Sequence, residues 1–249
     1  MKRFAMLILA VIAFGRTAAM AAEIKVLSAG AVEPGLHAFA ELAKRETGHE
    51  LKIQFNTGPQ IAKRLAAGEI YDILIAPPAV IAQAITENKV IPDTRVPVGR
   101  VGAGIVMRAG ASMPDVASVD ALKRALLSAD SLVYNTASTG LYLDKLFEKL
   151  SIAEAIKAKT TRYPNGEGVM EHLIQGKGNE IGFGAITEIR MYASKGLKLV
   201  GPLPLEVQNY TRYEAAVMTG TAVSAAARTI LLQLATPEAR QAIAAAGVE

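Results

Sequence analysis

Four turns in this sequence place small or hydroxyl-bearing residues at the start of a helix, where backbone amides can bind an anion. The turns are residues 28–35, 56–60, 134–141 and 163–169, and each follows a strand-like run. The first N–H groups of a helix have no partner within the helix, and the helix dipole adds partial positive charge there. Such turns are therefore suited to a negatively charged guest.

Residues from both halves of the chain are expected to contact this guest. Glycine and alanine leave backbone amides accessible, and the hydroxyls of serine and threonine add neutral donors. For each turn the alternative is ordinary helix capping, in particular by Ser138 or Thr139. The candidates from the four turns are Gly30, Ala31, Thr57, Gly58, Asn135, Ser138, Thr139, Gly140, Glu167 and Gly168.

Sequence motifs for catalysis are missing. The chain has neither a G-x-x-x-x-G-K-[ST] phosphate loop nor a G-x-S-x-G nucleophile turn. It has no cysteine, and its three histidines are scattered, so a thiolate or multi-histidine metal site is not expected. Glu33 and Glu167 lie near helix starts, where they either complement the helix dipole or contact a ligand. We expect no catalytic residues, no metal and no cofactor.

The first 22 residues have the pattern of a secretory signal peptide. Lys2 and Arg3 precede an apolar run of about a dozen residues, which is short for a membrane span. Cleavage is expected near Ala21 or Ala22, with export to the periplasm; a membrane anchor is the alternative. Without this segment the 27 basic residues fall to 24, against 23 acidic ones, and the net charge falls from +4 to +1. This charge gives no sign of nucleic-acid binding.

Strand-like apolar runs alternate with amphipathic helical runs, which is typical of an α/β fold with mostly parallel sheets flanked by helices. Two stretches, 96–109 and 206–214, are too long for ordinary strands, and Gly99, Gly102 and Gly104 would allow the first to bend. Two crossings of this kind predict two lobes. We expect lobe one to comprise 23–101 and 211–249 and lobe two to comprise 102–210, after the signal peptide 1–22. Strands are expected at 24–28, 51–55, 72–76, 98–107, 131–134, 180–184, 197–200 and 212–218; helices are expected at 34–47, 59–67, 79–87, 118–127, 139–150, 151–158, 167–175, 186–194, 222–234 and 237–245.

Several long stretches resemble the periplasmic molybdate-binding proteins of ABC importers. They are IKVLSAGAVEPGLHAFAELAKRETG, FNTGPQIAKRLAAGEIYDILIAPP, and KGNEIGFGAITEI followed by KGLKLVGPLP. The resemblance covers nearly the whole chain after the signal peptide. It implies a type II periplasmic-binding fold, in which two α/β lobes with a two-segment hinge close on a small anion. It also implies an ABC permease in the inner membrane as partner, and we expect the protein to be a monomer.

The residues expected at the anion differ from the family pattern in three places. Ala31 stands where molybdate-binding members have Ser, Thr57-Gly58-Pro59 replaces a Ser-rich turn, and Gly184-Ala185 occupies the place of a ligand-binding Tyr. Ala185 therefore joins the candidate ligand contacts. The expected guest is a molybdate-like oxyanion or a small organic acid, with Asn56, Arg162 and Tyr163 as further candidates for its polar ends. The alternatives to transport are a ligand sensor for a membrane receptor and an exported enzyme on the same scaffold.

Overall fold

The computed structural model describes residues 21–249. Residues 1–20, which make up most of the predicted signal peptide, therefore lie outside the described residues. No helix among the described residues is long and apolar enough to cross a membrane. The first elements along the chain are β1 (Glu23–Ala29), α1 (Glu33–Thr47), β2 (Glu50–Asn56), α2 (Gly58–Ala66), β3 (Ile73–Ala76), α3 (Pro78–Thr86) and β4 (Val96–Arg108).

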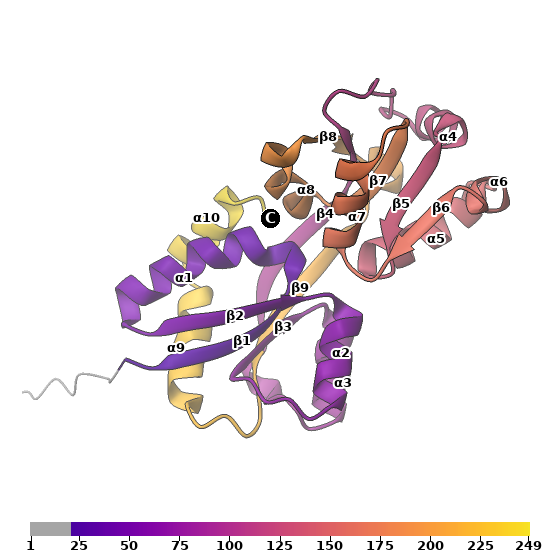
Figure 1. The fold of residues 1–249 in the computed structure, drawn as a ribbon. Coiled ribbons are helices and arrows are strands. Elements are labelled where there is room, and N and C mark those ends of the chain that lie inside the picture. Colours follow the sequence, from indigo (N-terminus) through magenta and orange to yellow (C-terminus); the bar gives the residue numbers. More distant parts are fainter. Residues whose placement is uncertain (1–20) are drawn as a thin grey trace, which may run out of the picture.

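The first lobe contains β1, β2 and β3 together with strand β9 from the end of the chain (Figure 1). β1 pairs in parallel with β2 and β3, and β9 pairs antiparallel with β3. Buried side chains of the strands, such as Ile24 and Ile73, share one core with Phe39 of α1 and Leu231 of α9. The remaining elements of this lobe are β9 (Tyr210–Val217), α9 (Ser224–Leu234) and α10 (Pro237–Ala245).

The second lobe is built on β5, with β6 and β7 parallel on its two sides. β4 pairs antiparallel with β7 and β8, and a second core forms around Phe147 and Phe183. Its elements are α4 (Val119–Ser128), β5 (Ser131–Asn135), α5 (Ser138–Lys149), α6 (Ala153–Lys157), β6 (Thr160–Tyr163), α7 (Gly166–Gln175), β7 (Glu180–Ala185), α8 (Ile186–Met191) and β8 (Leu197–Pro202).

β4 and β9 are the two long strands that pass between the lobes (Figure 1). Residues Val96–Gly102 of β4 pair with β9, whereas Ala103–Arg108 pair with β7 and β8. Core membership changes at the same place, because Val101 belongs to the first core and Ala103 to the second. On this change we propose the division into 23–101 with 211–249 and 102–210.

Gly99 and Gly104 of β4 have different roles. Gly99 has a φ of +154°, which other residues rarely adopt, and lies at a shift in register with β9. That it lets the strand bend stays a prediction. Gly104 instead makes room for a helix, since an added Cβ would lie 2.8 Å from Cγ1 of Ile186 on α8. The chain end packs beside Gly99: Val248 is buried, and the backbone of Glu249 exchanges two hydrogen bonds with Arg100.

The structure differs from the expected elements at two places. β6 was not predicted, because its sequence Thr-Thr-Arg-Tyr is polar and it lies at the edge of its sheet, where one side needs no apolar cover. The helix expected over 186–194 ends at Met191, and Gly196, with a φ of +87°, then turns the chain into β8.

Candidate ligand-binding site between the lobes

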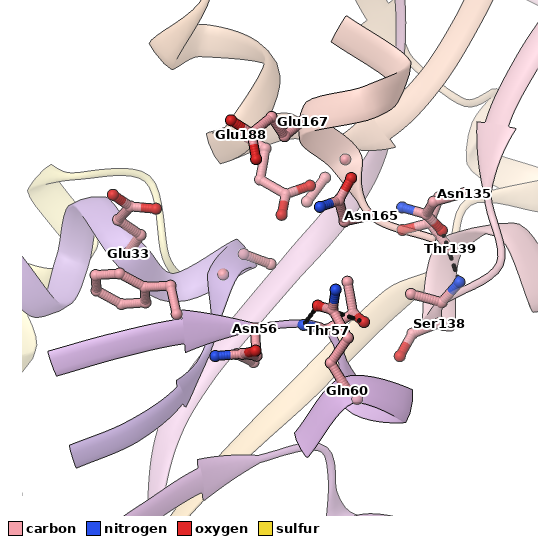
Figure 2. Close-up of a pocket in the computed structure, with 18 of the residues that line it drawn as sticks. Glu33, Asn56, Thr57, Gln60, Asn135, Ser138, Thr139, Asn165, Glu167 and Glu188 are labelled. Atoms are coloured by element: carbon pink, nitrogen blue, oxygen red, sulfur yellow. Dashed lines mark hydrogen bonds between the residues drawn. The ribbon is translucent and has the colours of Figure 1, made fainter. Parts of the chain in front are cut away.

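A cavity of about 370 Å³ lies between the lobes and is lined by residues of both. Asn56, Thr57 and Gln60 of the first lobe face the second-lobe residues across it (Figure 2). Of the eleven residues expected to contact a ligand, nine line this cavity, and their contact with a ligand stays a prediction. They are Gly30, Ala31, Thr57, Gly58, Asn135, Ser138, Thr139, Glu167 and Ala185.

Gly140 and Gly168 are the two candidates that do not line the cavity. The amide of Gly140 donates to Oδ1 of Asn135 at 3.2 Å, and that of Gly168 donates to Oδ1 of Asn165 at 3.0 Å. These amides already have acceptors, so we assign the two glycines to the shape of the turns instead of to the ligand. An added Cβ would lie 1.6 Å from the carbonyl oxygen of Asn135 at Gly140, and 2.7 Å from Cδ1 of Tyr163 at Gly168.

The turn before α2 is closed by a reciprocal cap. Oε1 of Gln60 accepts hydrogen bonds from both the amide and the hydroxyl of Thr57, at 2.8 and 3.0 Å. The Thr57 hydroxyl would have to turn away from Gln60 in order to donate to a ligand. Its neighbour Asn56 accepts from Nε of Arg64 at 3.1 Å, while its Nδ2 is buried without a partner among the described residues. Asn56 therefore carries a donor without a partner in this part of the chain, which the side chain would have to turn toward the cavity to offer to a ligand.

Asn135, and neither Ser138 nor Thr139, closes the turn before α5. Its Oδ1 accepts from the amides of Ala137 and Gly140. No hydrogen bond joins the hydroxyls of Ser138 and Thr139 to other residues within 21–249. This arrangement argues against capping as their role and leaves both hydroxyls available in the cavity (Figure 2).

Arg162 and Tyr163 were candidates for the polar ends of a ligand, but neither lines the cavity. Arg162 forms two hydrogen bonds with the carboxylate of Asp144 and also donates to the carbonyl oxygen of Asn135. Its guanidinium lies 4.3 Å from the ring centre of Tyr134. Burial of Tyr134 raises the pKa of its hydroxyl to about 12. The Tyr163 hydroxyl is 3.0 Å from Nδ1 of His172. Arg162 therefore supports the turn from behind the cavity.

Glu188 is the functional candidate that sequence reasoning missed. It lies in the first turn of α8, lines the cavity, and projects toward it in Figure 2. Burial raises the pKa of its carboxyl to about 7; a backbone hydrogen bond from Ala185 opposes the shift and the charge of Glu33 adds to it. The only sequence signal was its place three residues after β7, where the chain makes another strand-to-helix turn.

α8 also joins the two lobes. The hydroxyl of Thr187 donates to the carbonyl oxygen of Ala31 at 2.6 Å, and this contact is buried. Ala185, just before α8, packs into the core of the first lobe although its strand belongs to the second. Glu188 is thereby held at the base of the cavity, where the lobes meet.

The charges around the cavity do not by themselves favour an anion. Glu33, Glu167 and Glu188 line it, with Lys195 as the only Lys or Arg among the described lining residues. Apart from Lys195, the groups that could hold an anion here are neutral donors, namely amides, hydroxyls and carboxamides. Protonation of Glu188 would remove one of the three negative charges.

A family model described as bacterial extracellular solute-binding protein matches residues 24–249. The chain belongs to this family. Among solved structures, this solute-binding protein is similar to the periplasmic molybdate-binding protein of Azotobacter vinelandii, with a TM-score of 0.76 and 17% identity over 91% of this chain and 98% of that one. It is also similar to the sulfate-binding protein of Mycobacterium tuberculosis, with a TM-score of 0.75 and 16% identity over 91% and 86%. These structures confirm the two-lobed type II periplasmic-binding fold.

Among curated proteins, this solute-binding protein is similar to one named aconitate isomerase, from a Pseudomonas species. The two are 28% identical over 232 residues, which are 91% of this chain and 87% of the relative. This chain is thus similar to a protein named for an enzymatic activity as well as to solved structures named for binding.

Proposed function

We propose that this protein is the periplasmic binding component of an ABC importer and that it captures a small anion by closing its two lobes. The observation that carries the proposal is the cavity, because neutral donors from both lobes line the same space. A ligand that contacts both lobes stabilises the closed arrangement over the open one. The partner would be a permease in the inner membrane, and the protein would act as a monomer with no role in nucleic-acid binding.

Within the proposed class of anions, we favour a small organic acid with more than one carboxylate. A cavity of about 370 Å³ is large for a single four-oxygen anion and lies within the usual range for small-molecule sites. Its polar side chains are spread over several turns, with Asn56 and Gln60 in one lobe and Asn135, Ser138 and Thr139 in the other. Separate carboxylates of one ligand can be bound at separate turns. The name of the 28% identical relative points to the same class of ligand.

A second candidate function is isomerisation of such an acid. Moving a carbon–carbon double bond removes a proton from one carbon and returns one to another, so the reaction needs a group that exchanges protons near neutral pH. Glu188 is a carboxyl of this kind in the cavity, with its pKa raised to about 7. This residue and the relative named aconitate isomerase are the observations that favour an enzyme.

Calorimetric titration with molybdate, sulfate, phosphate, trans-aconitate and its saturated analogue tricarballylate tests both candidates. We expect tight binding of a carboxylate, together with a rise in melting temperature by mass action. Proton NMR of trans-aconitate left with the protein in D₂O then separates binding from catalysis. An unchanged spectrum favours capture, and conversion or deuterium uptake favours the isomerase. If no anion binds or is converted, both candidates are wrong.

Replacing both Ser138 and Thr139 by alanine should weaken binding far more than it lowers stability. Neither hydroxyl has a hydrogen bond to lose within the described protein, so the free energy of unfolding should change by less than about 0.5 kcal/mol. Two lost hydrogen bonds to a charged ligand should raise the dissociation constant about tenfold or more. Calorimetry and thermal melts measure the two effects. Equal losses of affinity and stability would show that the hydroxyls support the turn instead.

A further inference from the structure

Glu188 is enclosed between a glycine of each lobe. An added Cβ at Gly30 of the first lobe would lie 3.2 Å from its Oε1, and one at Gly166 of the second lobe would lie 2.6 Å from its Oε2. The Gly166 position is also 3.4 Å from Oε1, so the carboxyl group lies against the start of a helical turn in each lobe. Larger residues at these two positions would displace the side chain, so the backbone on both sides leaves room for this carboxyl at the base of the cavity.

Backbone groups compensate the negative charge of Glu188 in part, through a hydrogen bond from Ala185, but most of the charged side chains that line the cavity do not. The charge of Glu33 of α1 raises the Glu188 pKa, and Glu167 of α7 lines the same cavity. Burial raises the pKa of Tyr192 and of Tyr213, so both are neutral. Lys195, the one ammonium group among the described lining residues, is exposed and lies 4.7 Å from the ring centre of Tyr192. An incoming anion would add further negative charge to the same space. An ionised Glu188 repels such a ligand, whereas a protonated Glu188 can donate a hydrogen bond to one of its oxygens.

We infer that the protein binds its anion together with one proton and that this proton resides on Glu188 in the occupied cavity. The inference rests on the proposed function, since it assumes that an anion is the ligand. The proton comes from solvent; the carboxylate becomes a carboxylic acid whose O–H points to a ligand oxygen, and no covalent bond of the ligand changes. The raised pKa of Glu188 in the empty cavity supports the inference, because its proton can then be added near neutral pH. A bound anion raises that pKa further.

Calorimetry at pH 8 in two buffers with different ionisation enthalpies counts the protons taken up when trans-aconitate, tricarballylate or molybdate binds. We expect about one proton for each anion bound by the native protein and none for Glu188→Gln, whose amide is a donor at every pH. Between pH 7.5 and 9 the dissociation constant of the native protein should rise about tenfold per pH unit. That of Glu188→Gln should stay constant. Glu171→Gln, an exposed position of α7 outside the cavity, is the matched control and should behave as the native protein does.

Binding without proton uptake, or equal uptake by the native protein and Glu188→Gln, would overturn the inference while leaving the proposed function intact. The absence of binding by every anion would overturn both. If Glu188→Gln does not fold, infrared difference spectra of the native protein give a second test. A protonated-carboxyl band that appears on addition of anion at pH 8 supports the inference, and its absence contradicts it.

Discussion

Gly140→Ala is expected to destabilise the protein by about 3 kcal/mol or more, since no small adjustment can accommodate the new methyl group. The Cβ would lie 1.6 Å from the carbonyl oxygen and 2.7 Å from the carbonyl carbon of Asn135. These are backbone atoms at the end of β5, and Arg162 also holds that carbonyl oxygen through a hydrogen bond. The turn before α5 must therefore open, which would also displace the Ser138 and Thr139 hydroxyls from the cavity.

Thermal melts and urea unfolding measure this loss, which should lower the melting temperature by at least about 6 °C for a protein of this size. Gly110→Ala is the matched control, because an added Cβ there meets no atom within 4 Å. A Gly140→Ala protein that melts within two degrees of the native protein, with unchanged anion affinity, would show that this turn is shaped differently.

The stability of the ligand-free protein should fall as the pH rises from about 4.5 to 7, and Glu188→Gln should remove that component. The Glu188 pKa is raised from 4.5 to about 7 in the folded protein, so the folded state holds its proton more tightly than the unfolded chain does. The contribution of this group to the free energy of unfolding is fully present below pH 4.5, the pKa of the unfolded chain. It is lost as the pH rises through the pKa of the folded protein. The shift in the Glu188 pKa corresponds to a change of about 3 kcal/mol in the free energy of unfolding.

Urea unfolding of both proteins at pH 4.5, 6, 7 and 8 tests this expectation, with Glu171→Gln as the control for loss of a carboxylate. The stability of Glu188→Gln relative to the native protein should increase by about 3 kcal/mol across this range. Parallel curves for the two proteins would show that Glu188 titrates as an exposed carboxyl does, which is incompatible with its enclosed position.

The sequence predicted the fold well because the relevant signals are local. Pro59, Pro78 and Pro237 mark helix starts, and the apolar runs of β1 and β3 are fully buried. β6 was missed because an edge strand of Thr, Thr, Arg and Tyr has no apolar pattern.

The cavity was only partly predictable for a related reason. The turns could be listed from small residues, but which group closes each turn depends on side-chain geometry. Asn135 and not Ser138 accepts the amides before α5, for example. Glu188 could not be found from local sequence, since its environment is made by Gly30 and Gly166, which are 158 and 22 positions away in the chain.

The contact of Thr187 with Ala31 places the start of α8 where the two lobes already touch. In the proposed closure, a residue near the axis of rotation moves little, while residues at the rim move far. Glu188 would then meet the anion before closure, whereas side chains far from the axis, on the lobe that the anion does not contact first, would meet it only afterwards. Changes at the base of the cavity should therefore alter how fast the anion is captured, and changes at the rim should alter how long it is retained.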